Sequence, residues 1–226
     1  MKLKVLELFA GTRSIGRAFE KAGHEVFSID WDRQFQDIDM FADIGELSAA
    51  TILEVFGQPD IIFASPDCTS YSIAGISHHR RKEESGNLAP ISDYAKFCDQ
   101  VNVNMMKLIE DLKPKLFFIE NPRGGFRKMF FVQGINCYTV TYCQYELDKE
   151  PAQRRMKPTD IFTNHKEPNF KPVCKNGMPC HVQARRGART GTQGIKGTID
   201  RSRIPDELCK HIVRLSEDYC EGLQDG

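Results

Sequence analysis

The chain has 226 residues, of which 40% are hydrophobic and 27% are charged, and its formal net charge is zero. This length fits one domain with a substantial core, or a domain with a small addition, and the composition excludes disordered and fibrous classes. No apolar run approaches the roughly eighteen residues of a membrane span, and the start lacks a secretory pattern. The eight cysteines are too scattered for a disulfide scaffold, so we expect reduced thiols in a soluble cytoplasmic protein.

The zero net charge conceals an uneven distribution along the chain. Residues 1–150 carry a charge of −5, residues 151–204 carry +9 and residues 205–226 carry −4. A basic block between acidic flanks is a candidate surface for a polyanion. A solvated basic loop is the alternative.

Strands and helices are predicted to alternate over the first 121 residues. The predicted strands lie at 4–10, 24–30, 60–65 and 115–121. The predicted helices lie at 14–23, 47–57 and 92–113. The polar stretch at 78–87 reads as a mobile loop. This alternation is typical of an α/β fold with a doubly wound, mostly parallel sheet.

The pattern changes near residue 150. Residues 164–203 hold glycines, prolines and most of the basic excess with little periodicity, so we interpret them as a small irregular basic insert. Residues 204–222 predict a helix with apolar residues on one face. We therefore expect a main α/β domain at 1–163, the insert at 164–203 and a C-terminal segment at 204–226 that returns to the main domain.

The turn after the first predicted strand is a candidate nucleoside site. In ELFAGTRSIG (7–16) a glycine turn separates strand from helix, where a ligand can approach the backbone; a plain tight turn is the alternative. Asp30 ends the next predicted strand, a position suited to ribose hydroxyls. Trp31 offers a ring face to a base, unless it packs in the core. The dinucleotide fingerprint is incomplete, so S-adenosylmethionine fits better than a dinucleotide.

Two reactive side chains follow the next two predicted strands. Cys68 lies in ASPDCTSYSIAG (64–75) among polar residues; a single cysteine is more often a small buried apolar group, but these neighbours favour a reactive thiol. Glu120 lies in IENPRGG (119–125) and is a candidate proton donor, with a structural glutamate paired to an arginine as the alternative. Parallel sheets bind ligands at these strand ends.

Taken in order, these motifs resemble the cytosine-5 DNA methyltransferases. The matching segments are ELFAGTRSIG, DWD (30–32), DIG (43–45), SPDCTSYSIAG, FFIENPRG and QRRMK (153–157), followed by the closing helix. The resemblance covers 1–163 and 204–220. It implies a Rossmann-like fold, S-adenosyl-L-methionine as cofactor and DNA as partner, in a compact member of the phage or mobile-element type that works in a bacterial or phage-infected host cell. It leaves the oligomeric state open.

The resemblance also implies roles for single residues. Cys68 would add to carbon 6 of a flipped-out cytosine, Glu120 would protonate N3, and Arg155 would be a supporting cation, before carbon 5 takes the methyl group. The implied cofactor contacts are Phe9, Gly11, Asp30, Trp31, Asp43, Ile44 and Ser65.

DNA contacts are expected from two basic stretches. Arg80 and Arg81 belong to the loop after Cys68, which either closes over the flipped base or is only a charged loop. The arginines expected to contact DNA from the insert are Arg185, Arg186 and Arg189. An insert of about forty residues leaves open a very short target site, help from a partner, or a substrate smaller than duplex DNA, because base reading needs several side chains.

The insert also holds residue types that bind zinc, namely His165, Cys174, Cys180 and His181. Their spacing matches none of the strong CxxC pairs, so we expect ordinary loop thiols and no metal.

Two alternative functions stay open. One is a relative that modifies a nucleotide or an RNA base by the same thiol addition, and the other is a catalytically silent nucleic-acid-binding protein.

Overall fold

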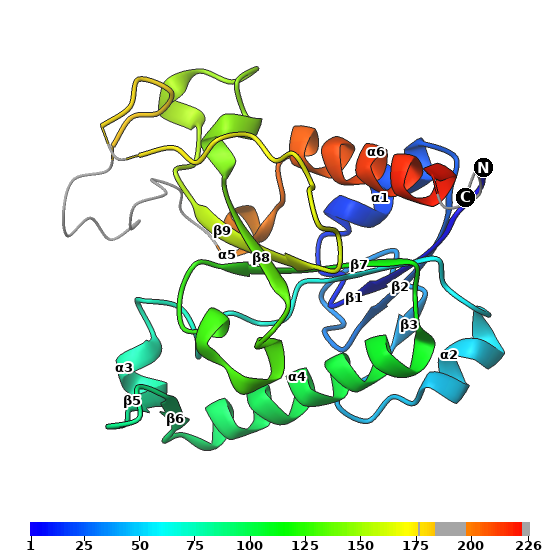
Figure 1. The fold of residues 1–226 in the computed structure, drawn as a ribbon, viewed down its shortest axis with the longest axis horizontal. Helices are drawn as coiled ribbons and strands as arrows, with labels where there is room; N and C mark the ends of the chain where they lie inside the picture. Colours follow the sequence, from blue (N-terminus) through cyan, green and yellow to red (C-terminus); the bar gives the residue numbers. More distant parts are fainter. Residues whose placement is uncertain (176, 184–197, 223–226) are drawn as a thin grey trace.

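The computed structural model describes residues 1–175, 177–183 and 198–222. A seven-stranded sheet of order β3-β2-β1-β4-β7-β9-β8 lies between two layers of helices (Figure 1). Its strands are β1 (Lys4–Leu8), β2 (Glu25–Asp30), β3 (Met40–Phe41), β4 (Ile61–Ala64), β7 (Leu116–Pro122), β8 (Asn136–Thr141) and β9 (Pro158–Thr163).

Six α-helices and four short 3₁₀ turns are described, and the 3₁₀ turns all lie in the connections between β7, β8 and β9. The α-helices are α1 (Ser14–Lys21), α2 (Ala49–Val55), α3 (Ile76–His79), α4 (Asp93–Leu112), α5 (Thr198–Ser202) and α6 (Asp206–Gly222). The 3₁₀ turns are η1 (Phe126–Lys128), η2 (Phe130–Val132), η3 (Tyr142–Tyr145) and η4 (Pro151–Gln153). None of the helices in the described ranges is both long and apolar enough to cross a membrane.

The sheet is parallel except at one edge. Strands β3, β2, β1, β4 and β7 pair in parallel, and β9 pairs antiparallel with both β7 and β8. The chain leaves β1 toward β2 and later returns to β4 on the other side of β1. Loops after β1 and β4 therefore diverge at this point, which is where open α/β sheets bind ligands. The predicted doubly wound, mostly parallel sheet is confirmed.

Two apolar clusters cover the two faces of the sheet. One packs α2 and α4 against the sheet, and Met105 and Leu108 of α4 are fully buried in it. The other packs α1 and α6 together, with Phe19 against Leu208 and Ile212 as members of one cluster. The two helix layers lie on opposite faces (Figure 1). This packing leaves the carboxyl ends of the parallel strands uncovered by either helix layer.

Three features differ from the pattern expected from sequence. The polar stretch at 78–87 contains β5 (Arg80–Lys82), which forms an antiparallel hairpin with β6 (Leu88–Pro90), so it is not simply a loop. Strands β8 and β9 were not predicted, because their polar residues mask the apolar pattern. Helix α5 adds regular structure to the expected irregular insert. The division into domains stays a prediction.

Candidate active site

The loop that carries Cys68 is anchored to the neighbouring strand. Cys68 is half-buried, four residues after β4. The side chain of Asn121, on β7, donates from Nδ2 to the carbonyl of Pro66 at 3.0 Å. The carbonyl of Cys68 accepts hydrogen bonds from the backbone N–H groups of Tyr71 and Ser72, at 3.0 and 2.8 Å. The thiol is therefore presented by a turn whose backbone is fixed on both sides.

Two adjacent glycines, Gly124 and Gly125, allow the loop after β7 to pack closely against the loop that carries Cys68. The N–H of Gly125 donates to the carbonyl of Tyr71 at 2.7 Å. A Cβ atom at Gly124 would lie 2.5 Å from that same oxygen, which no ordinary contact allows. The sequence ENPRGG therefore needs glycine here because the loop after β7 packs backbone to backbone against the loop of Cys68.

Glu120 lies buried near the end of β7, between an aromatic hydroxyl and an ammonium group. The hydroxyl of Tyr142 donates to Glu120 Oε1 at 2.8 Å. Lys157 Nζ lies 3.6 Å from the same oxygen and 4.7 Å from the centre of the Tyr142 ring. Glu120 is thus buried beside a cation, as the structural alternative expects, but among the described residues that cation is a lysine rather than an arginine.

Burial and neighbouring charges set the protonation of the Cys68 thiol. Burial raises its pKa to about 11, the cation of Lys157 opposes this rise, and the carboxylates of Asp67 and Glu120 add to it. A thiolate is the nucleophilic form. With its pKa raised in this way, Cys68 is a protonated thiol at neutral pH. Lys157 is the group that stabilises the thiolate once it forms.

Asp67 has a structural task besides its charge. Its side chain is exposed, and its Oδ1 accepts the N–H of Thr69 at 2.7 Å while Oδ2 accepts the Thr69 hydroxyl at 3.2 Å. Such a local side-chain turn fixes the backbone that follows Cys68. Asp67 therefore shapes the loop while it disfavours ionisation of the thiol.

The charges around Cys68 predict opposite effects of two substitutions on its reactivity. Lys157→Met removes a cation that lowers the thiol pKa, so at pH 8 to 9 it should slow alkylation of Cys68 by iodoacetamide roughly three- to tenfold. Asp67→Asn should accelerate it. Peptide mass spectrometry against time and pH measures both rates, with Lys128→Met at an exposed position as the control. An unchanged rate in Lys157→Met would remove Lys157 from the surroundings of the thiol.

The turn after β1 is built from left-handed backbone. Phe9, Gly11 and Arg13 have φ values of 55°, 49° and 54°. The N–H of Gly11 donates to Asp30 Oδ2 and the N–H of Asp32 donates to Asp30 Oδ1, both at 2.8 Å. Asp30 is buried, and burial raises its pKa. It braces the turn against the end of β2, and each of its oxygens retains a further lone pair for a ligand hydroxyl.

The remaining expected cofactor residues divide into exposed and buried ones. Trp31 is 69% exposed, so the alternative that it packs in the core is wrong and its ring face is free. Ser65 is half-buried at the end of β4, and Asp43 Oδ1 accepts the N–H of Gly45 at 2.8 Å. The side chain of Ile44 is 2% exposed and belongs to the core, so only its backbone is left to meet a ligand.

A buried glutamate explains the second glycine of ELFAGTRSIG. Glu7 Oε1 accepts the N–H of Gly16 at 2.9 Å, and a Cβ at that position would lie 2.3 Å from Glu7 Oε2. Burial raises the Glu7 pKa to about 7. Gly16 is therefore required by the approach of Glu7 to α1 rather than by a ligand.

The expected DNA contacts separate into different environments. Arg80 is buried; its Nη2 lies 2.6 Å from Asp99 Oδ1 and its Nε donates to the carbonyl of Ser70 at 3.0 Å. It holds the hairpin to α4 and does not face solvent, so its expected contact with DNA is not supported. Arg81, on the same hairpin, is exposed. The insert arginines Arg185, Arg186 and Arg189 lie outside the described residues.

Arg155 lies beside the site through Tyr142, whose ring centre is 5.2 Å from its guanidinium carbon, but its hydrogen bonds go elsewhere. Its Nε donates to Glu146 Oε1 at 2.7 Å, and its Nη1 donates to the carbonyl of Arg203 at 2.6 Å. It is buried and joins the chain before β9 to the segment after α5. Lys157 is the cation beside Glu120 instead. Its signal was present in QRRMK, whereas Tyr142 gave no sequence signal because β8 was not recognised.

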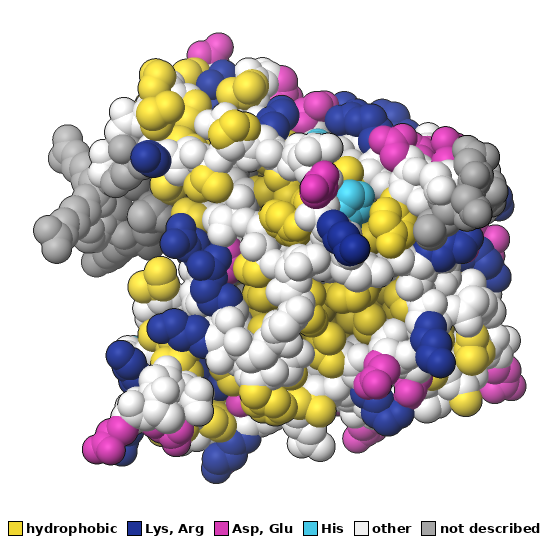
Figure 2. Space-filling view, viewed as in Figure 1, with side chains coloured by type: hydrophobic (Ala, Val, Ile, Leu, Met, Phe, Trp, Pro, Cys, Tyr) yellow, Lys and Arg dark blue, Asp and Glu magenta, His cyan; other side chains and the backbone are white. Residues whose placement is uncertain are grey.

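Lys and Arg side chains are visible on the surface around this region. Figure 2 shows several of them on the side of the molecule where α3 and β5 face the part that carries β8 and β9. Exposed basic residues in these elements and the loops beside them are Arg81, Lys82, Arg123 and Lys128. A polyanion is the ligand that such a surface favours.

Comparison with known proteins places these features in a family context. Residues 3–128 match the model of the family described as C-5 cytosine-specific DNA methylase. The chain is 28% identical over 224 residues to a protein named probable DNA (cytosine-5)-methyltransferase from Frog virus 3 (isolate Goorha), which covers 94% of this chain and 100% of that protein. It is 29% identical over 129 residues to the type II methyltransferase M.CviJI of Paramecium bursaria Chlorella virus IL3A.

The extent of these matches differs. The M.CviJI match covers 54% of this chain but only 30% of that protein. Among solved structures, the methyltransferase EhMeth of Entamoeba histolytica matches with a TM-score of 0.54 and 15% identity, covering 76% of this chain and 56% of that chain. The structural match supports the fold alone.

Proposed function

Because the chain belongs to the C-5 cytosine-specific DNA methylase family, we propose that it transfers a methyl group from S-adenosylmethionine to carbon 5 of cytosine in DNA, through a covalent bond to Cys68. The observation that carries this proposal is the pairing of two reactive groups. Cys68 follows β4 and Glu120 lies near the end of β7, the parallel strand beside it, and the charges of Glu120 and Lys157 both act on the thiol.

In this mechanism Cys68 is the nucleophile, and its bond to carbon 6 breaks again after methyl transfer, when carbon 5 loses its proton to solvent and the electron pair restores the ring double bond. A base flipped out of the duplex brings its carbon 6 to the thiol. The sulfur attacks as the thiolate, whose charge Lys157 stabilises. The backbone bonds from Tyr71 and Ser72 to the carbonyl of Cys68 hold the turn still during the attack.

Glu120 is the proton donor to N3 of the base. Its contacts with Tyr142 and Lys157 are both through Oε1, so we assign the donation to N3 to Oε2. Protonation of N3 draws electrons from the ring and makes carbon 6 a better electrophile. Buried position and two fixed partners hold the carboxyl group in one orientation.

The turn after β1 fits S-adenosylmethionine, which supplies the methyl group when bound. Asp30 keeps a lone pair on each oxygen for ribose hydroxyls, and the exposed Trp31 gives a face for the adenine ring. The backbone of Phe9 and Gly11 lies at the same strand end. These residues bind and orient the cofactor.

Cofactor binding should depend on Asp30 and Trp31. Asp30→Ala should weaken binding of S-adenosylhomocysteine about tenfold or more, because a lost hydrogen bond to a ligand is typically worth ~1–3 kcal/mol. Trp31→Ala, at an exposed position, should weaken it without lowering the thermal midpoint. Titration calorimetry measures the affinities, with Asp111→Ala on α4 as the control. Unchanged affinity in both variants would remove this turn from the cofactor site.

DNA is the proposed partner, and the basic residues of 151–204 other than the buried Arg155 and Lys157 are proposed to bind its phosphates together with Arg81. The excess charge of +9 in that block supports this part of the proposal. Phosphate contacts of this kind position the duplex and do not read the sequence.

The direct test of the proposed activity is methylation itself. DNA from cells that express the protein is sequenced after bisulfite treatment, with cells expressing Cys68→Ser as the control. Cytosines protected in a short common context, and only with the wild-type protein, are the expected result. Protection absent from DNA but present in cellular RNA would favour the RNA-modifying alternative, and absence from both would favour the silent binder.

A further inference from the structure

Four potential metal ligands meet at one point away from Cys68. One ligand atom each from Cys143, Cys174, Cys180 and His181 lies within 4.8 Å of the others. Cys143 belongs to η3, directly after β8, and the other three come from the segment that follows residue 171. His165, which the sequence also offered, is not a member.

Three separations within the cluster match the edges of a tetrahedral zinc site. Zinc bonds of about 2.3 Å to sulfur and about 2.0–2.1 Å to nitrogen place two sulfurs about 3.8 Å apart, and sulfur and nitrogen about 3.5 Å apart. His181 Nδ1 lies 3.5 Å from Cys174 Sγ and 3.4 Å from Cys180 Sγ, and Cys180 Sγ lies 3.8 Å from Cys143 Sγ. The Cys174–Cys180 separation of 3.1 Å is shorter than a tetrahedral edge, but far longer than a disulfide bond of about 2.05 Å.

The surroundings of the cluster also favour a cation. Cys143, Cys174 and His181 are buried, and Cys180 is half-buried. The ring of His181 turns Nδ1 toward the sulfurs of Cys174 and Cys180, so Nδ1 is the atom that would bind the ion. Thiols are weak hydrogen-bond donors, so three of them around an imidazole gain little from one another, whereas thiolates and imidazole are preferred ligands of zinc.

We propose that Cys143, Cys174, Cys180 and His181 bind one structural zinc ion. Four protein ligands complete the tetrahedron and leave no open position for water or substrate, which is the mark of a structural rather than a catalytic site. The four side chains come from two segments about thirty residues apart in the chain, so the ion would crosslink them.

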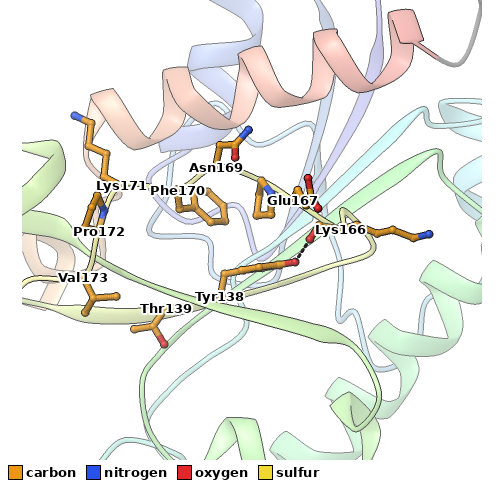
Figure 3. A pocket seen from close by; sticks show the side chains of 10 residues that line it. Tyr138, Thr139, Lys166, Glu167, Asn169, Phe170, Lys171, Pro172 and Val173 are labelled. Carbon is orange, nitrogen blue, oxygen red and sulfur yellow. Dashed lines mark hydrogen bonds between the residues drawn. The ribbon is translucent and has the colours of Figure 1, made fainter.

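The position of the cluster indicates what the ion would hold in place. Residues 166–173, which precede Cys174, run across β8 and line a pocket of about 390 Å³ (Figure 3). In this pocket the Tyr138 hydroxyl donates to the carbonyl of Lys166. The N–H of Cys174 then donates to Thr141 Oγ1 at 2.8 Å. The ion would fasten the end of this segment to the corner that follows β8.

That corner is directly linked to the candidate active site. Cys143 follows Tyr142, whose hydroxyl donates to Glu120. On the other side, His181 precedes the arginines at 185, 186 and 189 by only a few residues. A zinc ion here would therefore fix, relative to Glu120, the part of the insert that precedes these arginines. The existence of the metal site does not depend on the proposed function, whereas this positioning role does.

Metal content is the test of the site. The protein, expressed without a polyhistidine tag and purified in reducing buffer, should contain about one zinc per chain by plasma mass spectrometry. Cys143→Ser should lose most of it, and Cys137→Ser, at an exposed position on β8 outside the cluster, should keep it. Replacement of zinc by cobalt in the wild-type protein should give the intense visible bands of tetrahedral coordination by thiolates, a result that needs no variant to fold.

The same measurements define what would overturn the proposal. Reduced wild-type protein that holds no zinc and shows no tetrahedral cobalt spectrum would do so. Zinc retained at full stoichiometry in Cys143→Ser would overturn the assigned ligand set. A Cys174–Cys180 disulfide in protein purified without reductant, with no metal uptake after reduction, would replace the zinc site by a redox pair. Because none of these readouts involves methyl transfer, failure of the zinc site and failure of the proposed activity are distinguishable.

Discussion

Cys68→Ser is expected to lower the rate of methyl transfer to DNA by roughly 10⁴-fold or more. The serine hydroxyl is nearly isosteric but far less nucleophilic than a thiolate at neutral pH, and it removes the only atom proposed to bond with carbon 6. Single-turnover transfer of a labelled methyl group from S-adenosylmethionine measures the rate. Because the turn is held by backbone bonds at the Cys68 carbonyl, the fold should be unaffected.

Two controls separate this effect from loss of structure. Cys68→Ser should bind S-adenosylhomocysteine as tightly as the wild type, with the same thermal midpoint. Cys137→Ser should transfer methyl groups at the wild-type rate. If Cys68→Ser retained a rate near that of the wild type, the nucleophile would have to be another group and the assignment of the motif would be wrong.

Glu120→Gln is expected to slow the same step by roughly 10²- to 10⁴-fold, the usual contribution of a positioned acid. The amide has the shape of the carboxyl group, and its oxygen can still accept the Tyr142 hydroxyl bond. It cannot deliver a proton to N3. The rate of methyl transfer should therefore fall while affinities for cofactor and DNA remain close to those of the wild type.

The matched control is Glu54→Gln, at an exposed position on α2, which should leave the rate unchanged. If Glu120→Gln lost DNA affinity in proportion to its rate, Glu120 would be a binding residue rather than a proton donor. If it lost neither, protonation of N3 would have to come from another group.

Local patterns predicted the elements that are defined by their own residues. Strands β1, β2, β4 and β7 are apolar runs or alternating patterns that end near an acid or a polar loop, and α4 begins at the Ser92 cap and ends where Lys113 takes left-handed backbone. Strand β9 escaped prediction because it is buried throughout although it contains Thr159, Asp160 and Thr163. Asp160 is tolerated there because Arg127 and the Thr139 hydroxyl both bind it, and both partners lie more than twenty residues away in the chain.

The candidate site divides in the same way. Cys68, Glu120 and Asp30 could be predicted because the end of a parallel strand is set by local sequence. The roles of Lys157 and Tyr142 could not, because they reach Glu120 only through the pairing of β7 with β9 and of β9 with β8.

Sequence alone also could not assign two of the arginines. Arg80 and Arg155 looked like exposed or catalytic cations, but each is buried and bound by an acid, Asp99 and Glu146 respectively. The full ligand set of the proposed zinc site could not be predicted for a related reason, since Cys143 joins it from a distant part of the chain.

Trapping of the covalent intermediate is the most direct test of the proposal that Cys68 is the nucleophile. DNA that carries 5-fluorocytosine at the target cannot lose its ring substituent after methyl transfer, so the bond between sulfur and carbon 6 should persist through denaturation. We expect a protein–DNA adduct on a denaturing gel that requires S-adenosylmethionine, maps to the peptide containing Cys68 and is absent in Cys68→Ser. An adduct through Cys98, Cys137 or Cys143, or none on DNA that the wild-type protein methylates, would contradict it.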